Sequence, residues 1–340
     1  MRLSMKVPRE IIELINREER FTVVSHINPE GDALGSAIAL AVALDSIGKD
    51  VVVFNRDGIP SLYSFLPLSG LVVTGLSDER LKESVTVILD CNSLDRAGLE
   101  DAPVSKSVII DHHVTENNFG DLRWIEPSAP ATGVMIYHLI KELNVGFTPE
   151  IATNLYTAIA IDTGTFRFEN TTSESLRIAA DLVDAGARPG SISISLYESW
   201  PRERFNLLVR MLNTLELRDL TRDSGAGIGG KDRDTITVAI TTITHSMFRE
   251  TGTDSSNTEN FSNFPRMISD VDISVMLREF EPGKWKASLR SKGDVNVAEV
   301  AFRLGGGGHK NAAGFKLEGD IDDVKKRFLA TAKKALLDDN

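Results

Sequence analysis

Histidine and carboxylate side chains gather at four places in the first half of the chain, each close behind an apolar run. They are His26, Glu30 and Asp32, then Asp90, then Asp111, His112 and His113, and then Asp162. Imidazole nitrogens and carboxylate oxygens without thiolates suit Mn²⁺ or Mg²⁺ better than a cysteine-type zinc site. The set exceeds what one ion needs, and two ions about 3.5–4 Å apart can activate a water and neutralise a phosphate. This pattern predicts metal-assisted hydrolysis of a phosphoester.

A second cluster, near the end of the chain, suits a bound phosphate. Gly305–Gly308 is a run of four glycines followed directly by His309. Successive backbone N–H groups can form an anion-binding concavity, and a plain linker needs no histidine. Arg290 is the best phosphate clamp because a guanidinium can bind a phosphate through two hydrogen bonds, and Arg266 lies in the same part of the chain. The alternative is a flexible glycine loop beside solvated arginines.

Strands and helices alternate through the part of the chain that holds the histidines and carboxylates. β-Branched runs predict strands over 21–25, 51–54, 86–90 and 108–111, and amphipathic runs predict helices over 33–47, 131–143, 149–161 and 173–185. This alternation predicts an α/β fold, with a parallel sheet and helices on both of its faces. A single aspartate at a strand end more often caps a helix or a turn. Ligands bind at the carboxyl ends of parallel strands, however, so we expect all four groups at one sheet edge.

The length of 340 residues predicts two domains, since a domain usually has about 100–200 residues. We expect a catalytic domain over 1–188, a linker helix over 189–218 and a smaller α/β substrate-binding domain over 219–340. The Gly186–Gly190 segment is typical of a break between domains. In the last domain we expect strands over 235–244, 271–280 and 284–291, the last two as a hairpin, loops over 222–234 and 251–263, and a helix over 320–337.

Composition restricts the classes of function. Hydrophobic residues make up 41% of the chain, so it can form cores and is not disordered. The formal net charge of -11 argues against a protein that wraps long duplex DNA. Cys91 is the one cysteine, which excludes an intramolecular disulfide and a cysteine-rich metal site. The chain has no apolar run of about 18 residues and no apolar signal core at its start, so we expect a cytoplasmic protein without a membrane partner.

The order and spacing of these residues resemble a known family. The segments His26-x-Asn-Pro-Glu30-x-Asp32, Asp90, Asp111-His-His113 and Asp162 resemble the four motifs of the DHH phosphoesterase superfamily. The segment Gly305–Gly314 resembles the signature of its DHHA1 C-terminal domain. The resemblance extends over almost the whole chain. Within the superfamily, which includes RecJ-like nucleases, it is greatest to the nano-RNase and pAp-phosphatase type.

The resemblance implies a role for each residue. His26, Glu30 and Asp90 would hold one ion, and Asp32, Asp90, His112 and Asp162 would hold the other, with Asp90 bridging. Asp111 would orient a ligand imidazole, and His113 would face the scissile phosphate. The substrate would bind through Arg266, Arg290, Gly306, Gly307, Gly308 and His309. The family usually uses manganese (two Mn²⁺ ions), with Mg²⁺ or Co²⁺ as alternatives. Glu30 departs from the family pattern, which has aspartate there, and this longer side chain can change metal spacing or occupancy.

The resemblance implies metal-dependent hydrolysis of short oligonucleotides, linear dinucleotides such as pApA, or 3′-phosphoadenosine 5′-phosphate (pAp). The partners would be short single-stranded oligonucleotides or nucleotide phosphates, and family members often form homodimers. A single-strand-specific exonuclease is an alternative that would need a longer basic channel. Cyclic-dinucleotide phosphodiesterases are another, and they often carry membrane-anchored sensory domains. The alternative outside enzymes is a nucleotide sensor with weak catalysis, for which Glu30 is the hint.

Overall fold

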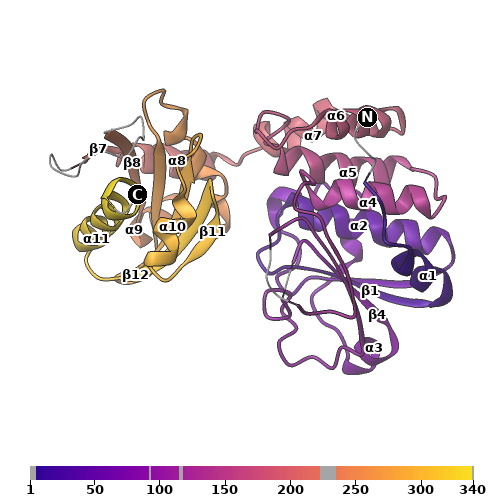
Figure 1. Cartoon of the computed structure of the whole chain (residues 1–340). Helices are drawn as coiled ribbons and strands as arrows, with labels where there is room; N and C mark the ends of the chain where they lie inside the picture. Colours follow the sequence, from indigo (N-terminus) through magenta and orange to yellow (C-terminus); the bar gives the residue numbers. More distant parts are fainter. Residues whose placement is uncertain (1–4, 92, 115–117, 223–234, 339–340) are drawn as a thin grey trace. The chain divides into compact units, whose positions relative to one another are not determined.

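The computed structural model describes residues 5–91, 93–114, 118–222 and 235–338. The chain divides into two compact units, Met1–Ser199 and Trp200–Asn340 (Figure 1). The glycine-rich loop predicted over 222–234 lies outside the described residues, apart from Arg222. None of the helices in the described segments has the length and apolar character that crossing a membrane demands.

A six-stranded sheet forms the centre of the first unit, with the strand order β3-β2-β1-β4-β5-β6. Its strands are β1 (Arg20–Ser25), β2 (Asp50–Phe54), β3 (Val72–Val73), β4 (Val85–Leu89), β5 (Lys106–Asp111) and β6 (Leu122–Ile125). Every adjacent pair is parallel, as the alternation of strands and helices predicts. Since β1, β4 and β5 are neighbours, the residues that follow these three strands meet at one edge of the sheet.

Some helices of the first unit lie directly against this sheet, and others pack on those helices. The helices are α1 (Arg9–Arg17), α2 (Gly31–Ser46), α3 (Asp78–Glu83), α4 (Thr132–Glu142), α5 (Pro149–Asp162), α6 (Ser173–Asp184) and α7 (Pro189–Ser193). Apolar residues of α2, α4 and α5 share one core with those of the sheet, and these three helices lie on the same side of it (Figure 1). Leu81 of short α3 and apolar residues of 93–104 belong to a separate core on the other face. α2 and α5 approach closely at Gly35, where a Cβ atom would collide with the backbone of Asn154. This contact holds the start of α2 against α5, near the sheet edge.

The second unit has a sheet of mixed direction, with the strand order β11-β12-β10-β9-β8-β7. Its strands are β7 (Glu216–Thr221), β8 (Thr235–Ile243), β9 (Ile273–Glu281), β10 (Lys284–Ser291), β11 (Gly307–His309) and β12 (Ala312–Glu318). The pair β8–β9 is parallel and the others are antiparallel. The predicted hairpin of β9 and β10 is confirmed. Together the two units confirm the predicted α/β class, a parallel-sheet domain followed by a smaller α/β domain.

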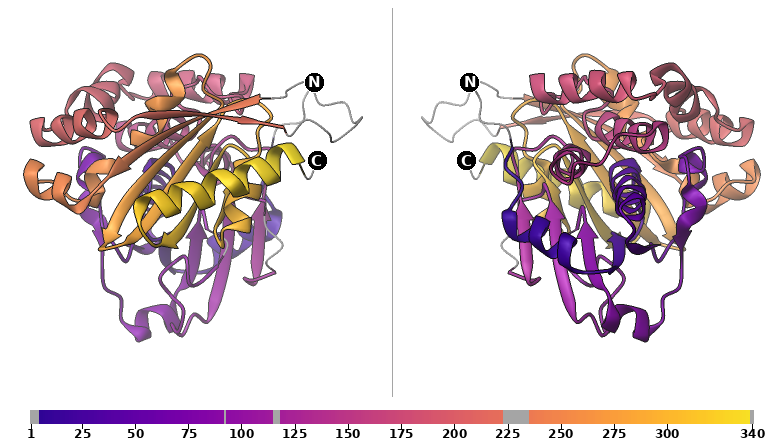
Figure 2. Two further views of the ribbon diagram at one scale, coloured as in Figure 1. Left: turned by 90° about the vertical axis from the view of Figure 1, so that its left-hand side faces the viewer. Right: turned by 90° about the vertical axis from the view of Figure 1, so that its right-hand side faces the viewer.

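Helices cover the two faces of the second sheet differently. They are α8 (Arg202–Leu212), α9 (His245–Thr251), α10 (Val297–Arg303) and α11 (Ile321–Lys333). α10 and α11 share the larger core with the sheet, and α11 runs across that face (Figure 2). On the opposite face, α8, α9 and Phe261 form a smaller core with Ile243 of β8 and Met276 of β9. The opposite face of β10 and β12 lies outside both cores.

Three predictions about irregular segments need correction. The segment 189–218 is not one helix, since α8 begins at Arg202 and β7 begins at Glu216. Pro201 accounts for the break, because proline cannot continue a helix and the residue before it favours an extended backbone. The predicted loop over 251–263 contains short 3₁₀ turns, and the last helix gives way to a π-helical turn after Lys333. The domain boundaries at residues 188 and 218 stay predictions.

Candidate active site

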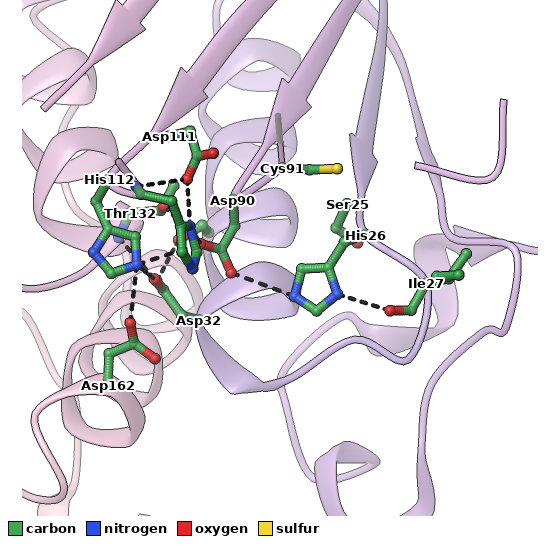
Figure 3. A network of polar contacts seen from close by, with 12 residues as sticks. Ser25, His26, Ile27, Asp32, Asp90, Cys91, Asp111, His112, Thr132 and Asp162 are labelled. Carbon is green, nitrogen blue, oxygen red and sulfur yellow. Dashed lines mark hydrogen bonds and ion pairs between the residues drawn. The ribbon is translucent and has the colours of Figure 1, made fainter. Parts of the chain in front are cut away.

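His26 and His112 are held in the same way although they follow different strands. His26 Nδ1 lies 2.8 Å from the Ile27 carbonyl oxygen, and His112 Nδ1 lies 3.2 Å from the Ala129 carbonyl oxygen. A carbonyl oxygen can only accept, so Nδ1 of each ring carries a proton and donates it. The Nε2 atom of each ring then faces Asp90 (Figure 3). Such outer hydrogen bonds are typical of histidines that bind metals through Nε2.

Asp90 lies between the two imidazoles. Its Oδ2 atom is 3.5 Å from His26 Nε2, and its Oδ1 atom is 3.5 Å from His112 Nε2. Asp90 follows β4 directly and has a φ of 56°, in the left-handed region. Aspartate tolerates this region better than bulky residues. The position is secured by the Asp90 backbone N–H, which donates to the Ile110 carbonyl oxygen at 3.0 Å. The carboxylate therefore presents one oxygen to each histidine.

Asp32 is buried and receives hydrogen bonds from the start of α4. The backbone N–H groups of Thr132 and Gly133 donate to its two oxygens at 2.7 and 2.8 Å, and Ser36 Oγ donates at 3.0 Å. Thr132 Oγ1 also donates to Asp90 Oδ1 at 3.1 Å. Sequence reasoning did not identify Thr132 or Gly133 as site residues. The signal that was present is Pro130, which marks the chain turn immediately before a helical run.

Asp162, the last residue of α5, completes this group. Its Oδ2 atom lies 3.1 Å from His112 Nε2. The backbone then turns sharply, because Gly164, Thr165 and Phe166 all have positive φ, at 57°, 59° and 60°. Asn170 Nδ2 closes the turn by donating to the Asp162 carbonyl oxygen at 3.0 Å. The end of α5 is thereby fixed at the sheet edge.

Asp111 and His113 form a separate pair beside Asp90. His113 Nδ1 donates to Asp111 Oδ1 at 2.6 Å, and the His113 backbone N–H donates to the same oxygen at 3.0 Å. His113 Nδ1 is also 3.5 Å from Asp90 Oδ1. Asp111 was expected to orient a ligand imidazole, but the ring that it orients is the one expected to face the phosphate. His112, which lies nearer to the other carboxylates, uses the Ala129 carbonyl oxygen instead.

The charges of this group shift its pKa values strongly. Burial lowers the pKa of His112, but the carboxylates of Asp162, Asp90 and Asp32 outweigh burial and raise it to about 10. The pKa of His26 is raised as well, because Asp90 outweighs the effect of burial. Burial would raise the pKa of Asp90, yet the neighbouring histidines lower it to about 2. Burial and the charges of Asp162 and Asp90 raise the pKa of Asp32.

The donor set fits divalent cations. Within the described segments, two sets of three donor atoms lie within 4.8 Å of one another, Asp90 with His112 and His113, and Asp32 with His112 and Asp162. His112 Nε2 is buried and has no well-aligned hydrogen-bond partner among the described residues. Carboxylates crowded around such an atom favour a bound cation that neutralises them. Cys91 is buried beside the site, and burial raises the pKa of its thiol to about 11, so it supplies no thiolate ligand.

Glu30 and His26 are the predicted ligands that belong to neither donor set, but His26 faces Asp90 whereas Glu30 points to solvent. Glu30 is the residue before α2, and its side chain is exposed, whereas Asp32 two residues later is buried. The structure thus gathers His26, Asp32, Asp90, Asp111, His112, His113 and Asp162 at one sheet edge. Glu30 as a metal ligand stays a prediction.

The predicted substrate-binding residues lie in the second unit, and two of them share a row of its sheet. Ala312 of β12 pairs with Arg290 of β10 on one side and with His309 of β11 on the other. Residues directly opposite one another point to the same face of a sheet, so Arg290 and His309 flank the small Ala312. Arg266 precedes β9 in the chain and lies beside the end of β10, where its Nη1 atom donates to the carbonyl oxygen of Ser291 at 3.3 Å.

The glycines form an edge strand rather than a flexible loop. Gly307–His309 pairs with β12 as strand β11. Gly308 has a φ of 142°, and a Cβ atom there would lie 2.5 Å from the Ala312 carbonyl oxygen. A Cβ atom at Gly306 would collide with the backbone of Gly314, whereas one at Gly307 would meet nothing. Two of the glycines therefore permit close strand packing beside His309.

Comparison with known proteins agrees with this geometry. Residues 20–159 match the N-terminal domain of the DHH family, and residues 235–338 match the DHHA1 domain. The chain is 33% identical over 337 residues to a Thermus thermophilus protein named bifunctional oligoribonuclease and PAP phosphatase NrnA, covering 98% of this chain and 94% of the relative. A Bacillus subtilis protein of the same name is 26% identical, with 90% and 91% covered.

Solved structures share the arrangement of strands and helices. An exopolyphosphatase-related protein from Bacteroides fragilis matches with a TM-score of 0.84 at 26% identity, covering 96% of this chain and 95% of that protein. RecJ of Thermus thermophilus, solved with Mn²⁺, shares the fold at a TM-score of 0.53 and 16% identity, over 98% of this chain and 56% of RecJ. With both domains matched and a relative at 33% identity over nearly its full length, this chain belongs to the DHH family of phosphoesterases and carries a C-terminal DHHA1 domain.

Proposed function

We propose that this chain is a metal-dependent phosphoesterase that hydrolyses short oligonucleotides, linear dinucleotides and pAp. One observation carries the proposal: Asp90 presents one carboxylate oxygen to His26 and the other to His112. A carboxylate in this position can bridge two cations, each held in addition by one imidazole. Two of the relatives are named as oligoribonuclease and PAP phosphatase, which supports the substrate class.

Residues of the first unit would then have three roles: to hold one cation, to hold a second cation, and to contact the reacting phosphate. His26, Glu30 and Asp90 would hold one cation, and Asp32, Asp90, His112 and Asp162 would hold the other. Two bound Mn²⁺ ions, or Mg²⁺ or Co²⁺ in their place, would activate a water and neutralise charge on the phosphate. Asp111 accepts the Nδ1 proton of His113. That bond leaves His113 Nε2 as the ring atom that can contact a phosphoryl oxygen or protonate the leaving oxygen.

The second unit would contribute residues that bind the nucleotide or its terminal phosphate. Arg290 and His309 share a row of the sheet, and Arg266 is held at its end. Guanidinium and imidazole groups in this arrangement suit the nucleotide or its terminal phosphate. Gly306, Gly307 and Gly308 would let that phosphate approach the backbone. A cytoplasmic location and a homodimer stay predictions, and nothing in the net charge of -11 favours a long duplex substrate.

Hydrolysis of a substrate panel tests the proposal. The purified chain is stripped with a chelator, reloaded with Mn²⁺, Mg²⁺ or Co²⁺, and given pAp, a 5′-phosphorylated RNA dinucleotide, linear and cyclic di-adenylate and a long single strand. We expect turnover of pAp and the linear short substrates only after metal is restored. Equal turnover of the long strand would instead indicate a single-strand exonuclease. Tight nucleotide binding without turnover under any metal would contradict the proposal and indicate a sensor.

A further inference from the structure

Three cations stand side by side on the second sheet. Lys286 of β10 pairs directly with Arg278 of β9 on one side and with Lys316 of β12 on the other. We call these three residues the cation row. Like charges directly opposite one another destabilise a sheet. A row of three cations therefore does not stabilise the fold, which suggests that it has a binding function.

The next row along the sheet shows the ordinary arrangement. There Lys284 pairs with Glu281 and Glu318, and its Nζ atom lies 2.7 Å from Glu281 Oε2 and 3.9 Å from Glu318 Oε1. Opposite charges thus alternate across that row. The contrast shows that the same three strands can place opposite charges directly opposite one another, whereas at the cation row the residues that pair across the strands are all cations. Asp254 is the acidic group that acts on Arg278 from outside the strands.

The cation row lies on the same face as the proposed phosphate clamp. Trp285, Ala287 and Leu289 are buried in the core with α10 and α11. Because strand side chains alternate between the two faces, Lys286, Ser288 and Arg290 lie on the opposite face. The distance along β10 from Arg290 to Lys286 is four residues, or about 13 Å.

Small residues separate the cation row from Arg290 and His309. Between the two rows, Ser288 of β10 pairs with Gly314 of β12, which in turn pairs with Gly307 of β11. None of these three has a side chain large enough to block a chain that crosses them. Lys316 Nζ also lies 5.4 Å from the centre of the Phe280 ring, so an aromatic side chain stands beside the cations. Cations combined with an aromatic ring are the usual means of holding single-stranded nucleic acid.

We propose that the cation row binds phosphates of an oligonucleotide beyond the one at Arg290. Substrate chains longer than a dinucleotide would cross Ser288, Gly314 and Gly307 and place a further phosphate at Lys286 and Lys316. The inference rests on the proposed function, since the cation row would bind a further part of the oligonucleotide substrate proposed above. It makes the cation row a determinant of preferred substrate length.

The test compares two double variants of equal charge change. Lys286→Gln with Lys316→Gln removes two cations of the row. Lys326→Gln with Lys334→Gln removes two exposed lysines of the C-terminal helical segment, on the face that α11 covers. The readout is kcat/KM for an RNA pentanucleotide divided by kcat/KM for the RNA dinucleotide. We expect this ratio to fall by about tenfold in the first variant and to stay at the wild-type value in the second.

Binding distinguishes this inference from the proposed function. Fluorescence anisotropy with a labelled RNA pentanucleotide needs no turnover and applies even if the chain hydrolyses nothing. The slope of log Kd against log salt should become shallower by about 1.4 in the row variant, since each lost contact to a single strand contributes about 0.7. Lys286→Arg with Lys316→Arg should restore the slope. An unchanged slope and ratio in the row variant, with thermal stability retained, would overturn the inference.

Discussion

Thr132 Oγ1 donates a hydrogen bond to Asp90 Oδ1 at 3.1 Å, which joins the start of α4 to the residue after β4. Because His112 Nε2 lies 3.5 Å from the same oxygen, the hydroxyl fixes the oxygen that faces this histidine. Loss of an outer group of this kind typically costs about 10–100-fold in metal affinity or activity. We expect Thr132→Val to weaken Mn²⁺ binding by this factor, measured by titration calorimetry. Thr132→Ser keeps the hydroxyl, and affinity that fell equally in both variants would contradict the assignment.

Asp90→Asn tests the proposed bridging carboxylate more severely. The substitution keeps the size of the side chain and a residue that tolerates a positive φ, but it removes the negative charge that lies between His26 and His112. We expect kcat to fall by more than about 100-fold, beyond the usual effect of an outer group, with a far-UV spectrum like that of the wild type. Retained turnover in Mn²⁺ would refute the two-metal assignment.

Metal binding should release a proton. The pKa of His112 is raised from its ordinary value of 6.5 to about 10 by the surrounding carboxylates, so the metal-free ring is protonated at pH 7.5. A cation that takes Nε2 must displace that proton. We expect calorimetric heats of Mn²⁺ binding at pH 7.5 to differ between buffers of different ionisation enthalpy, by at least about one proton per protein. Heats independent of the buffer would contradict this prediction.

The same shift predicts how the metal-free protein responds to pH. A group whose pKa is raised on folding stabilises the folded state below its unfolded pKa, and this stabilisation is lost as the pH rises through the folded pKa. For His112 the loss runs from about pH 6.5 to about pH 10. The melting temperature in chelator should therefore decline over this range. His112→Asn should flatten the decline, and an identical decline in that variant would assign it to other groups.

Gly308 and Gly307 form a matched pair for testing the edge strand. Gly308 has a φ of 142° and no room for a Cβ atom, whereas a Cβ atom at Gly307 meets nothing. Gly308→Ala should lower the free energy of unfolding by about 1–3 kcal/mol, the usual cost of a strained backbone position. Gly307→Ala should change it far less. Urea unfolding followed by fluorescence measures both, and equal effects would show that β11 packs differently from this structure.

Glu30 tests whether the exposed position at the start of α2 binds metal. It lies in neither donor set, and the proposed function assigns it to only one of the two cations. Its removal should therefore affect that cation alone. We expect Glu30→Gln to lower the bound Mn²⁺ from about two ions to about one per chain, measured by elemental analysis after dialysis. Glu79→Gln, an exposed glutamate in α3, serves as the control. A stoichiometry of two in the Glu30 variant would remove Glu30 from the ligands.

The sequence pattern predicts well which residues meet at the sheet edge, because the carboxyl ends of parallel strands all lie at the same edge. Short β-branched runs alternating with helices place His26, Asp90 and Asp111 at equivalent strand ends, and the observed order β1-β4-β5 makes them neighbours. The hydrogen bonds between them could not be predicted. Asp111 bonds to His113 whereas His112 bonds to the Ala129 carbonyl oxygen, and sequence spacing does not determine the backbone and side-chain torsions on which this choice depends.

The end of the chain was harder to predict for a different reason. A run of four glycines has no side-chain periodicity, so it resembles a loop even where it forms β11. The sequence predicts the β9–β10 hairpin, but it does not show which strands pair when they are far apart along the chain. Lys286 and Lys316 are thirty positions apart and become neighbours only through the β10–β12 register. The cation row therefore depends on strand pairing, which the sequence does not show, whereas the positions of the proposed metal ligands follow from where the strands end.

Gly164, Thr165 and Phe166, which follow Asp162 and have positive φ, matter for any attempt to engineer this chain. Thr165 and Phe166 occupy a conformation that suits glycine or asparagine, and a β-branched residue there is strained. Thr165→Gly and Thr165→Asn are the first substitutions to choose for higher thermal stability, since removing backbone strain commonly raises the melting temperature. Because Thr165 lies three residues after Asp162, a proposed metal ligand, we expect any gain in melting temperature to be accompanied by a lower turnover number.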